Sequence, residues 1–234
     1  MRILIIGDSV AIRIRPPRKI IDELTYSEIV AKERPQDIVQ NEALGSTVVP
    51  FKMEEIDKII NKQPDIIIIN WGIVDACTRP VSRSLYTFLN TQNPSSSLFI
   101  TVVKKAFNLA EKKFRRELTL LRGKRSWTSA KAFQTKYMRL IQHLQKDTRS
   151  QIICLSINET NSRVENFLPG SKNNIILFNS IIKKLTIAHS INYLDTSKIV
   201  SIEEIPDGIH FNAEGHRKIG EAILKVINQN SSNV

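Results

Sequence analysis

The chain alternates short apolar runs with longer stretches in which apolar residues recur every three or four positions. The unbroken runs lie at 3–6, 66–69 and 152–155, and each is followed by polar residues. Short runs rich in β-branched residues are typical of strands buried on both faces of a parallel sheet. Weaker runs at 37–40 and 191–194 predict two further short strands. The pattern predicts a three-layer α/β/α sandwich around a parallel sheet of four or five strands.

The segments between the runs carry helix signals. Thr25 and Glu28 have the spacing of a capping box, which predicts a helix that ends near Arg34, before Pro35. A short amphipathic helix is expected over 52–61, with Met53, Ile56, Ile59 and Ile60 facing inward. A helix over 173–188 and a last helix that begins at Asn212 complete the outer layers.

A basic helical segment spans residues 98–148. Apolar residues at 102, 103, 107, 110, 114, 118 and 121 have a helical period that should end at Gly123. A second helix is expected over 126–146, with Phe133, Tyr137, Leu140, Ile141 and Leu144 on one side. The lysines and arginines of the first helix lie on its other faces.

Composition bounds the class of protein. The chain has 234 residues, which suits one α/β domain over 1–234, and no apolar run approaches 18 residues, which argues against a membrane span. The first strand is too short for a signal-peptide core, and Cys77 and Cys154 do not suggest a disulfide framework. We therefore expect a cytoplasmic protein. Nothing in the sequence predicts the oligomeric state.

The net charge of +11 comes entirely from one part of the chain. Residues 101–150 hold 14 Lys/Arg and three Asp/Glu, and the remainder is balanced. Two interpretations stay open: a core-packing helix pair with a solvated lysine face, which is favoured, or a binding surface for an anionic glycan or a membrane. A nucleic-acid partner is not expected, because only 6% of residues are aromatic and no recognition motif is visible.

Candidate chemistry lies at both ends of the chain. Gly7-Asp8-Ser9 follows the first strand, where open α/β sheets place their ligands, so Ser9 could be a nucleophile if a base reached it. Asp207 precedes His210 by three residues, a spacing that lets the carboxylate orient the imidazole while the other ring nitrogen takes a proton.

Together these motifs resemble the SGNH/GDSL hydrolase family, whose flavodoxin-like fold agrees with the predicted sheet. The resemblance implies a catalytic triad of Ser9, Asp207 and His210. It also implies an oxyanion hole in which the backbone N–H of Ser9 and of Gly45 take part. The family's Gly-x-Asn-Asp motif corresponds to Gly72-Ile73-Val74-Asp75, so valine replaces the asparagine that donates to the oxyanion.

Other polar residues near these motifs are candidates for lesser roles. Arg79 and Asn70 could replace the missing donor or contact substrate. Four more substrate-binding candidates share the same loops: Asp8, Arg13, Arg15 and Asp75. His143, His189 and His216 are expected to be structural. No residues have metal-ligand spacing and no Gly-rich phosphate loop is present, so neither a metal nor a cofactor is expected.

The resemblance implies a serine esterase that hydrolyses small acyl esters, and O-acetyl groups on a carbohydrate fit best. The Gly-Ile-Val-Asp segment followed by Arg79-Pro80 is similar to a subgroup linked to bacterial surface-polysaccharide synthesis. Two alternatives remain: an O-acetyltransferase that uses the same triad to acylate a polysaccharide, and an SGNH-fold binding protein with impaired catalysis, which Val74 favours.

Overall fold

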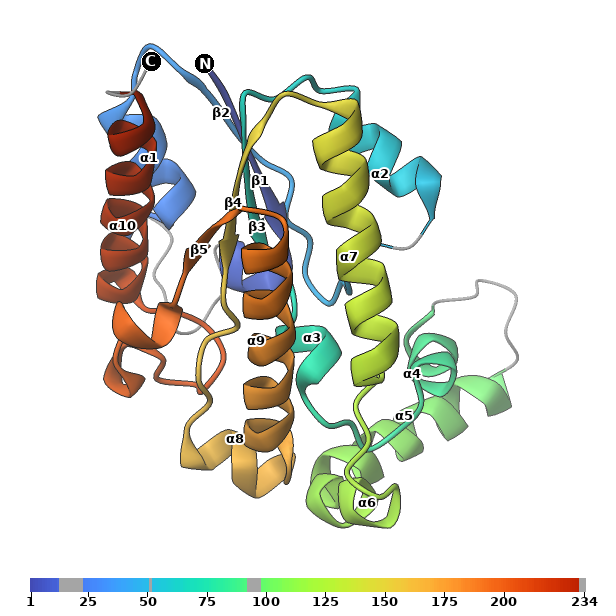
Figure 1. Ribbon diagram of the computed structural model, residues 1–234. Coiled ribbons are helices and arrows are strands. Elements are labelled where there is room, and N and C mark those ends of the chain that lie inside the picture. Colours follow the sequence, from blue (N-terminus) through green and yellow to red (C-terminus); the bar gives the residue numbers. More distant parts are fainter. Residues whose placement is uncertain (13–22, 51, 92–97, 232–234) are drawn as a thin grey trace.

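A parallel five-stranded sheet lies at the centre of the computed structural model, which describes residues 1–12, 23–50, 52–91 and 98–231 (Figure 1). The strand order is β2-β1-β3-β4-β5. The strands are β1 (Arg2–Gly7), β2 (Ile38–Asn41), β3 (Ile66–Asn70), β4 (Gln151–Leu155) and β5 (Asn192–Leu194). This confirms the predicted parallel sheet.

Burial of the strands follows their position in the sheet. All five residues of β3, the central strand, are buried, whereas the edge strand β2 is mostly exposed. β1 pairs with β3 so that Gly7 lies opposite Asn70. A Cβ on Gly7 would lie 2.4 Å from the Asn70 carbonyl oxygen, so this close approach of two strand ends requires glycine. The carboxyl ends of β1 and β3 are thereby held together.

Helices cover both faces of the sheet, as Figure 1 shows. One layer consists of α1 (Tyr26–Glu33) and α10 (Ala213–Ser231), and the other of α2 (Met53–Ile60), α7 (Ala130–Asp147) and α9 (Ser171–Ala188). The capping box at Thr25 and Glu28 is present, and the predicted inner sides of α2 and α7 face the core. The shorter helices are α3 (Ile73–Ala76), α4 (Arg83–Asn90), α5 (Leu98–Lys113), α6 (Arg115–Leu121) and α8 (Ser162–Phe167).

The three remaining elements are short 3-10 helices, η1 (Ser9–Ala11), η2 (Thr196–Lys198) and η3 (Ile202–Glu204). Cys77 and Cys154 are both buried and free. No helix in the described ranges is long and apolar enough to cross a membrane.

The basic helical segment differs from expectation in its first half. The chain leaves helical geometry at Phe114, whose φ and ψ are −111° and 28°, so the predicted helix over 99–121 is two helices, α5 and α6. None of the described residues of α5 or α6 belongs to the main hydrophobic core. The core-packing interpretation is therefore correct for α7 and wrong for α5 and α6. Periodicity shows that a helix has an apolar face, but not what covers that face.

Candidate active site

Ser9 and His210 meet at the carboxyl end of the sheet, although 201 positions separate them in the sequence. Ser9 opens η1 directly after β1, and its Oγ lies 2.9 Å from His210 Nε2. His210 Nδ1 lies 2.7 Å from Asp207 Oδ2. The other carboxylate oxygen, Oδ1, accepts hydrogen bonds from the backbone N–H of Ile209 at 2.9 Å and of His210 at 2.7 Å. Serine, imidazole and carboxylate thus form one continuous chain of contacts.

The hydrogen bonds around Asp207 keep its carboxylate ionised. Burial raises the pKa of Asp207, but hydrogen bonds from the His210 ring and from the two backbone N–H groups outweigh burial and hold its pKa below the usual range. An ionised carboxylate accepts the Nδ1 proton of His210, which leaves Nε2 as an acceptor toward Ser9. The arrangement can therefore remove a proton from the Ser9 hydroxyl.

Two asparagines hold the loop that carries Asp207 and His210. The Asn158 amide donates to the Ile209 carbonyl at 2.9 Å, and the Asn161 amide donates to the carbonyls of Ile205 and Pro206, each at 3.4 Å. Both asparagines follow β4, so they join the base-bearing loop to the sheet. The sequence alone does not reveal this role, because only the fold shows which loop passes over the two asparagines.

Gly45 lies beside Ser9, as the resemblance implies for an oxyanion-hole residue. A Cβ built on Gly45 would be 3.9 Å from the Cβ of Ser9. The loop around Gly45 is fixed to the end of β1, because the backbone N–H of Leu44 and the hydroxyl of Thr47 both donate to the Gly7 carbonyl. The backbone around Gly45 is thus positioned next to the candidate nucleophile.

Asp8 joins the Ser9 turn to the loop after β3. Its Oδ1 accepts from the Val10 N–H at 3.1 Å and its Oδ2 from the Gly72 N–H at 3.2 Å. Gly72 has φ +141°, and a Cβ there would meet Ile157 at 2.6 Å, so only glycine suits this position. Asp8 is 1% exposed. This burial corrects the expectation that Asp8 contacts substrate, and the carboxyl instead positions two loops of the site.

The other candidate donors and substrate-binding residues that the structure describes are held by contacts within the protein. Asp75 is fully buried and accepts the Val49 N–H at 3.0 Å, so it too is closed to substrate, contrary to expectation. The Arg79 guanidinium lies over Trp127, 4.4 Å from the ring centroid, and donates to the Val74 carbonyl. The Asn70 amide donates to the Tyr26 hydroxyl at 3.1 Å. Arg13 and Arg15 lie outside the described residues.

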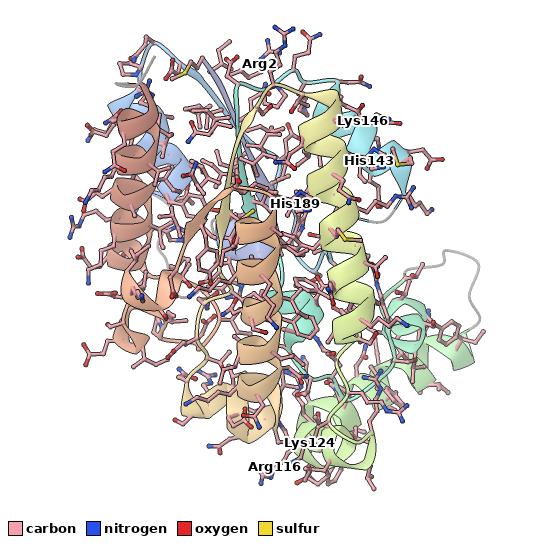
Figure 2. The ribbon with its side chains drawn as sticks, viewed as in Figure 1. Arg2, Arg116, Lys124, His143, Lys146 and His189 are labelled. Carbon is pink, nitrogen blue, oxygen red and sulfur yellow. The ribbon has the colours of Figure 1, made fainter. Side chains whose placement is uncertain are left out.

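The other histidines have structural contacts. Figure 2 shows His143 on α7 and His189 at the end of α9, away from the sheet end that carries Ser9. His189 Nδ1 lies 2.8 Å from Gln145 Oε1. His216 is buried in α10, where its Nδ1 accepts the Tyr26 N–H at 3.1 Å and links α10 to α1. No cluster of His, Cys, Asp or Glu that could hold a metal occurs among the described residues.

Solved structures match the fold of this protein over nearly the whole chain. One is a lipase/acylhydrolase from Enterococcus faecalis, with a TM-score of 0.64, 14% identity and coverage of 98% of this chain and 97% of that one. Another, from Parabacteroides merdae, is described as a GDSL-like lipase; its TM-score is 0.61 at 15% identity, over 94% of this chain and 92% of that one. The chain has the SGNH/GDSL hydrolase fold.

A third SGNH-fold match is Est24, a carbohydrate acetylesterase from Sinorhizobium meliloti, with a TM-score of 0.61, 12% identity and coverage of 97% and 98% of the two chains. No sequence-family model matches the chain, and no curated protein does. Identities this low establish the SGNH fold alone, so the activity has to be argued from the site.

The buried carboxyl of Asp8 gives a pH-dependent prediction. Burial raises the pKa of Asp8 to about 7, against the opposing effect of its hydrogen bonds from Val10 and Gly72. Between its unfolded pKa and about 7 the folded state holds a proton that the unfolded state has lost, so this group's contribution to stability falls as pH rises through that window. Asp8→Asn should remove this contribution.

Urea unfolding of wild type and Asp8→Asn across the acidic-to-neutral range measures the difference directly. We expect the free energy of unfolding of Asp8→Asn, relative to wild type, to increase as pH rises toward about 7 and to level off above it. The hydrogen bonds that Asp8→Asn loses or alters add a constant, independent of pH, to this difference in free energy of unfolding. A difference that does not change with pH would show that Asp8 is ionised throughout.

Proposed function

We propose that this protein is a serine esterase of the SGNH/GDSL family that hydrolyses small acyl esters through a covalent acyl-enzyme. The observation that carries the proposal is the unbroken contact chain from Ser9 through His210 to Asp207. A binding protein has no need of a serine, an imidazole and a carboxylate in this order. The SGNH fold supports the same chemistry, and so do its structural matches, which include a lipase/acylhydrolase and a carbohydrate acetylesterase.

The reaction takes two steps. Ser9 Oγ attacks the ester carbonyl while its proton moves to His210 Nε2, and the backbone N–H groups of Ser9 and Gly45 stabilise the oxyanion. The carbonyl then re-forms, the C–O bond to the alcohol breaks, and His210 returns the proton to the leaving alkoxide. In the second step water attacks the acyl-enzyme with His210 again as the base, and the acid and Ser9 are released.

An O-acetyl group on a carbohydrate is the proposed substrate class. Support comes from the carbohydrate acetylesterase among the structural matches and from the similarity of the 72–80 segment to the polysaccharide-linked subgroup. An acyl-enzyme can also pass its acyl group to a sugar hydroxyl instead of to water. Hydrolysis and transfer differ only in which acceptor reaches the intermediate.

Turnover of p-nitrophenyl acetate tests the proposal, with and without an added acceptor sugar. We expect release of nitrophenol and acetate by wild type and none above background by Ser9→Ala. Acetylated sugar in place of acetate would identify a transferase with the same triad. Equal rates for wild type and Ser9→Ala would favour the binding protein, whose specific support is Val74 in place of the oxyanion-donating asparagine.

A further inference from the structure

Helices α4, α5 and α6 extend from the lower right of the molecule in Figure 1, outside the layers that cover the sheet. We call residues 83–90 and 100–125 the projection. Its base is held at the site end of the sheet, where Thr78 bridges to Ser126 and the Arg79 N–H donates to the Arg125 carbonyl at 3.0 Å. The projection is therefore attached next to the loop that follows Val74.

The apolar side of α5 faces outward. At 100° per residue, the polar residues Thr101, Lys104, Asn108 and Glu111 share one side of the helix, and all four are half-buried. The opposite half carries the exposed apolar side chains of Val102, Val103, Ala106, Leu109 and Ala110, whereas Phe107 lies on the half-buried side. Val102 and Leu109 are 57% and 69% exposed. An ordinary surface helix has the reverse arrangement.

The neighbouring helices also carry exposed apolar side chains. Phe88 of α4, Phe114 at the start of α6 and Leu121 at its end are all exposed, and Leu121 is 84% exposed. Lys104 Nζ lies 4.7 Å from the centroid of the Phe88 ring, and Lys113 Nζ lies 5.4 Å from that of Phe114. Apolar and cationic groups thus occur side by side at two places on the projection.

The charge of the projection is strongly one-sided. The projection contains ten Lys/Arg and two Asp/Glu, and one of those acids, Glu111, pairs with Arg115. Figure 2 shows Arg116 and Lys124 at the bottom of the molecule beside α6, where Arg116 donates to the Asn166 carbonyl of α8. Exposed apolar residues flanked by lysines and arginines are typical of segments that lie in the interface of an anionic membrane.

We infer that the projection docks on an anionic membrane surface, with the outward half of α5 in the interfacial region and the basic residues on acidic headgroups. A polyanionic glycan would satisfy the lysines but leave the apolar half in water. A second copy of the chain would cover the apolar half but bring two like-charged surfaces together. An anionic lipid surface is complementary to both features.

The inference goes beyond ester hydrolysis and does not depend on it. Because the projection is attached at the end of the sheet that carries Ser9, docking would bring the site near the membrane. If the proposed esterase activity is correct, the natural ester is then one held at or near the membrane. Vesicle binding by Ser9→Ala, expected to equal that of wild type, separates this inference from the catalytic proposal.

Flotation with vesicles of phosphatidylcholine alone, or mixed with phosphatidylglycerol, tests the inference on the full chain. Binding is expected only with phosphatidylglycerol and should weaken as salt rises. Val102→Ser with Leu109→Ser should weaken it by roughly tenfold or more, and Gln at Lys105, Lys112 and Lys113 by roughly 10²-fold. All five positions are exposed, so the variants should fold.

Matched controls lie on α9. Ile176 and Ile187 are as exposed as the projection's apolar residues, and Lys183 and Lys184 are exposed lysines. Ile176→Ser with Ile187→Ser, and Lys183→Gln with Lys184→Gln, should leave vesicle binding unchanged. Absence of binding to phosphatidylglycerol vesicles would overturn the inference. An equal loss of binding in the α9 controls would also overturn it, as would binding to an anionic polysaccharide but not to vesicles. The same holds for a dimer, seen in sedimentation velocity, that Val102→Ser with Leu109→Ser dissociates.

Discussion

Replacing Asp207 with asparagine is expected to lower kcat for ester hydrolysis by about 10⁴ while the protein remains folded. The asparagine carbonyl can keep the two hydrogen bonds that Oδ1 accepts from Ile209 and His210. Its NH₂ group would replace Oδ2, which now lies 2.7 Å from His210 Nδ1. A donor at this place favours the tautomer in which Nδ1 is the acceptor and Nε2 carries the proton. His210 then cannot take the proton from Ser9.

The matched control is Asp195→Asn. Asp195 directly follows β5, and like Asp207 it accepts a backbone N–H two residues further along the chain; it also accepts from the hydroxyl of Ser197. It has no described contact with His210, so kcat should not change. Steady-state turnover of p-nitrophenyl acetate, with circular dichroism to check folding, measures both variants. A loss under tenfold in folded Asp207→Asn would mean that Asp207 does not set the tautomer of His210.

Replacing Val74 with asparagine is expected to raise kcat by up to 10²–10³, which corresponds to about 3 kcal/mol of transition-state stabilisation. Val74 is the second residue of α3, whose N-cap is Gly72, and the Gly72 N–H donates to Asp8 next to Ser9. An amide here would add a side-chain donor to the backbone donors of Ser9 and Gly45. Wild type, which lacks it, should hydrolyse simple esters slowly.

Val74→Leu controls for shape, since leucine has the branching of asparagine but no donor. It should leave kcat at or below the wild-type value. The gain in Val74→Asn would be smaller if Arg79 already donates to the oxyanion, and Arg79→Ala would then cost activity that Val74→Asn restores. The structure instead places the Arg79 guanidinium over Trp127. Folded Val74→Asn with no gain, in either Arg79 background, would show that position 74 does not face the oxyanion.

The strands of the sheet and the residues Ser9, Asp207 and His210 could be predicted because each of their sequence signals is local. Residues 3–6 and 66–69 are apolar without interruption, and this pattern is typical of a strand buried on both faces. Ser9 follows the first such strand, and the spacing of Asp207 and His210 is that of a carboxylate that orients an imidazole. The predicted contacts between Ser9, His210 and Asp207 are therefore confirmed as geometry.

What the sequence could not show depends on which segments meet in space. Asp8 was expected to contact substrate, but the loop at Gly72 covers it and uses its carboxylate. Asn158 and Asn161 have no sequence signal that names the loop they hold. The apolar period of α5 predicted a helix correctly. It could not show that the polar side, with Thr101 and Asn108, is turned inward while most of the apolar residues face outward.

The central claim is that Ser9 becomes covalently bonded during turnover. Intact-mass spectrometry after reaction with a fluorophosphonate probe tests it most directly, because the probe needs the activated serine but no knowledge of the natural ester. We expect a single adduct on wild type, none on Ser9→Ala, and strongly slowed labelling of Asp207→Asn. A wild-type protein that stays unlabelled, or Ser9→Ala labelled to the same extent, would contradict the account.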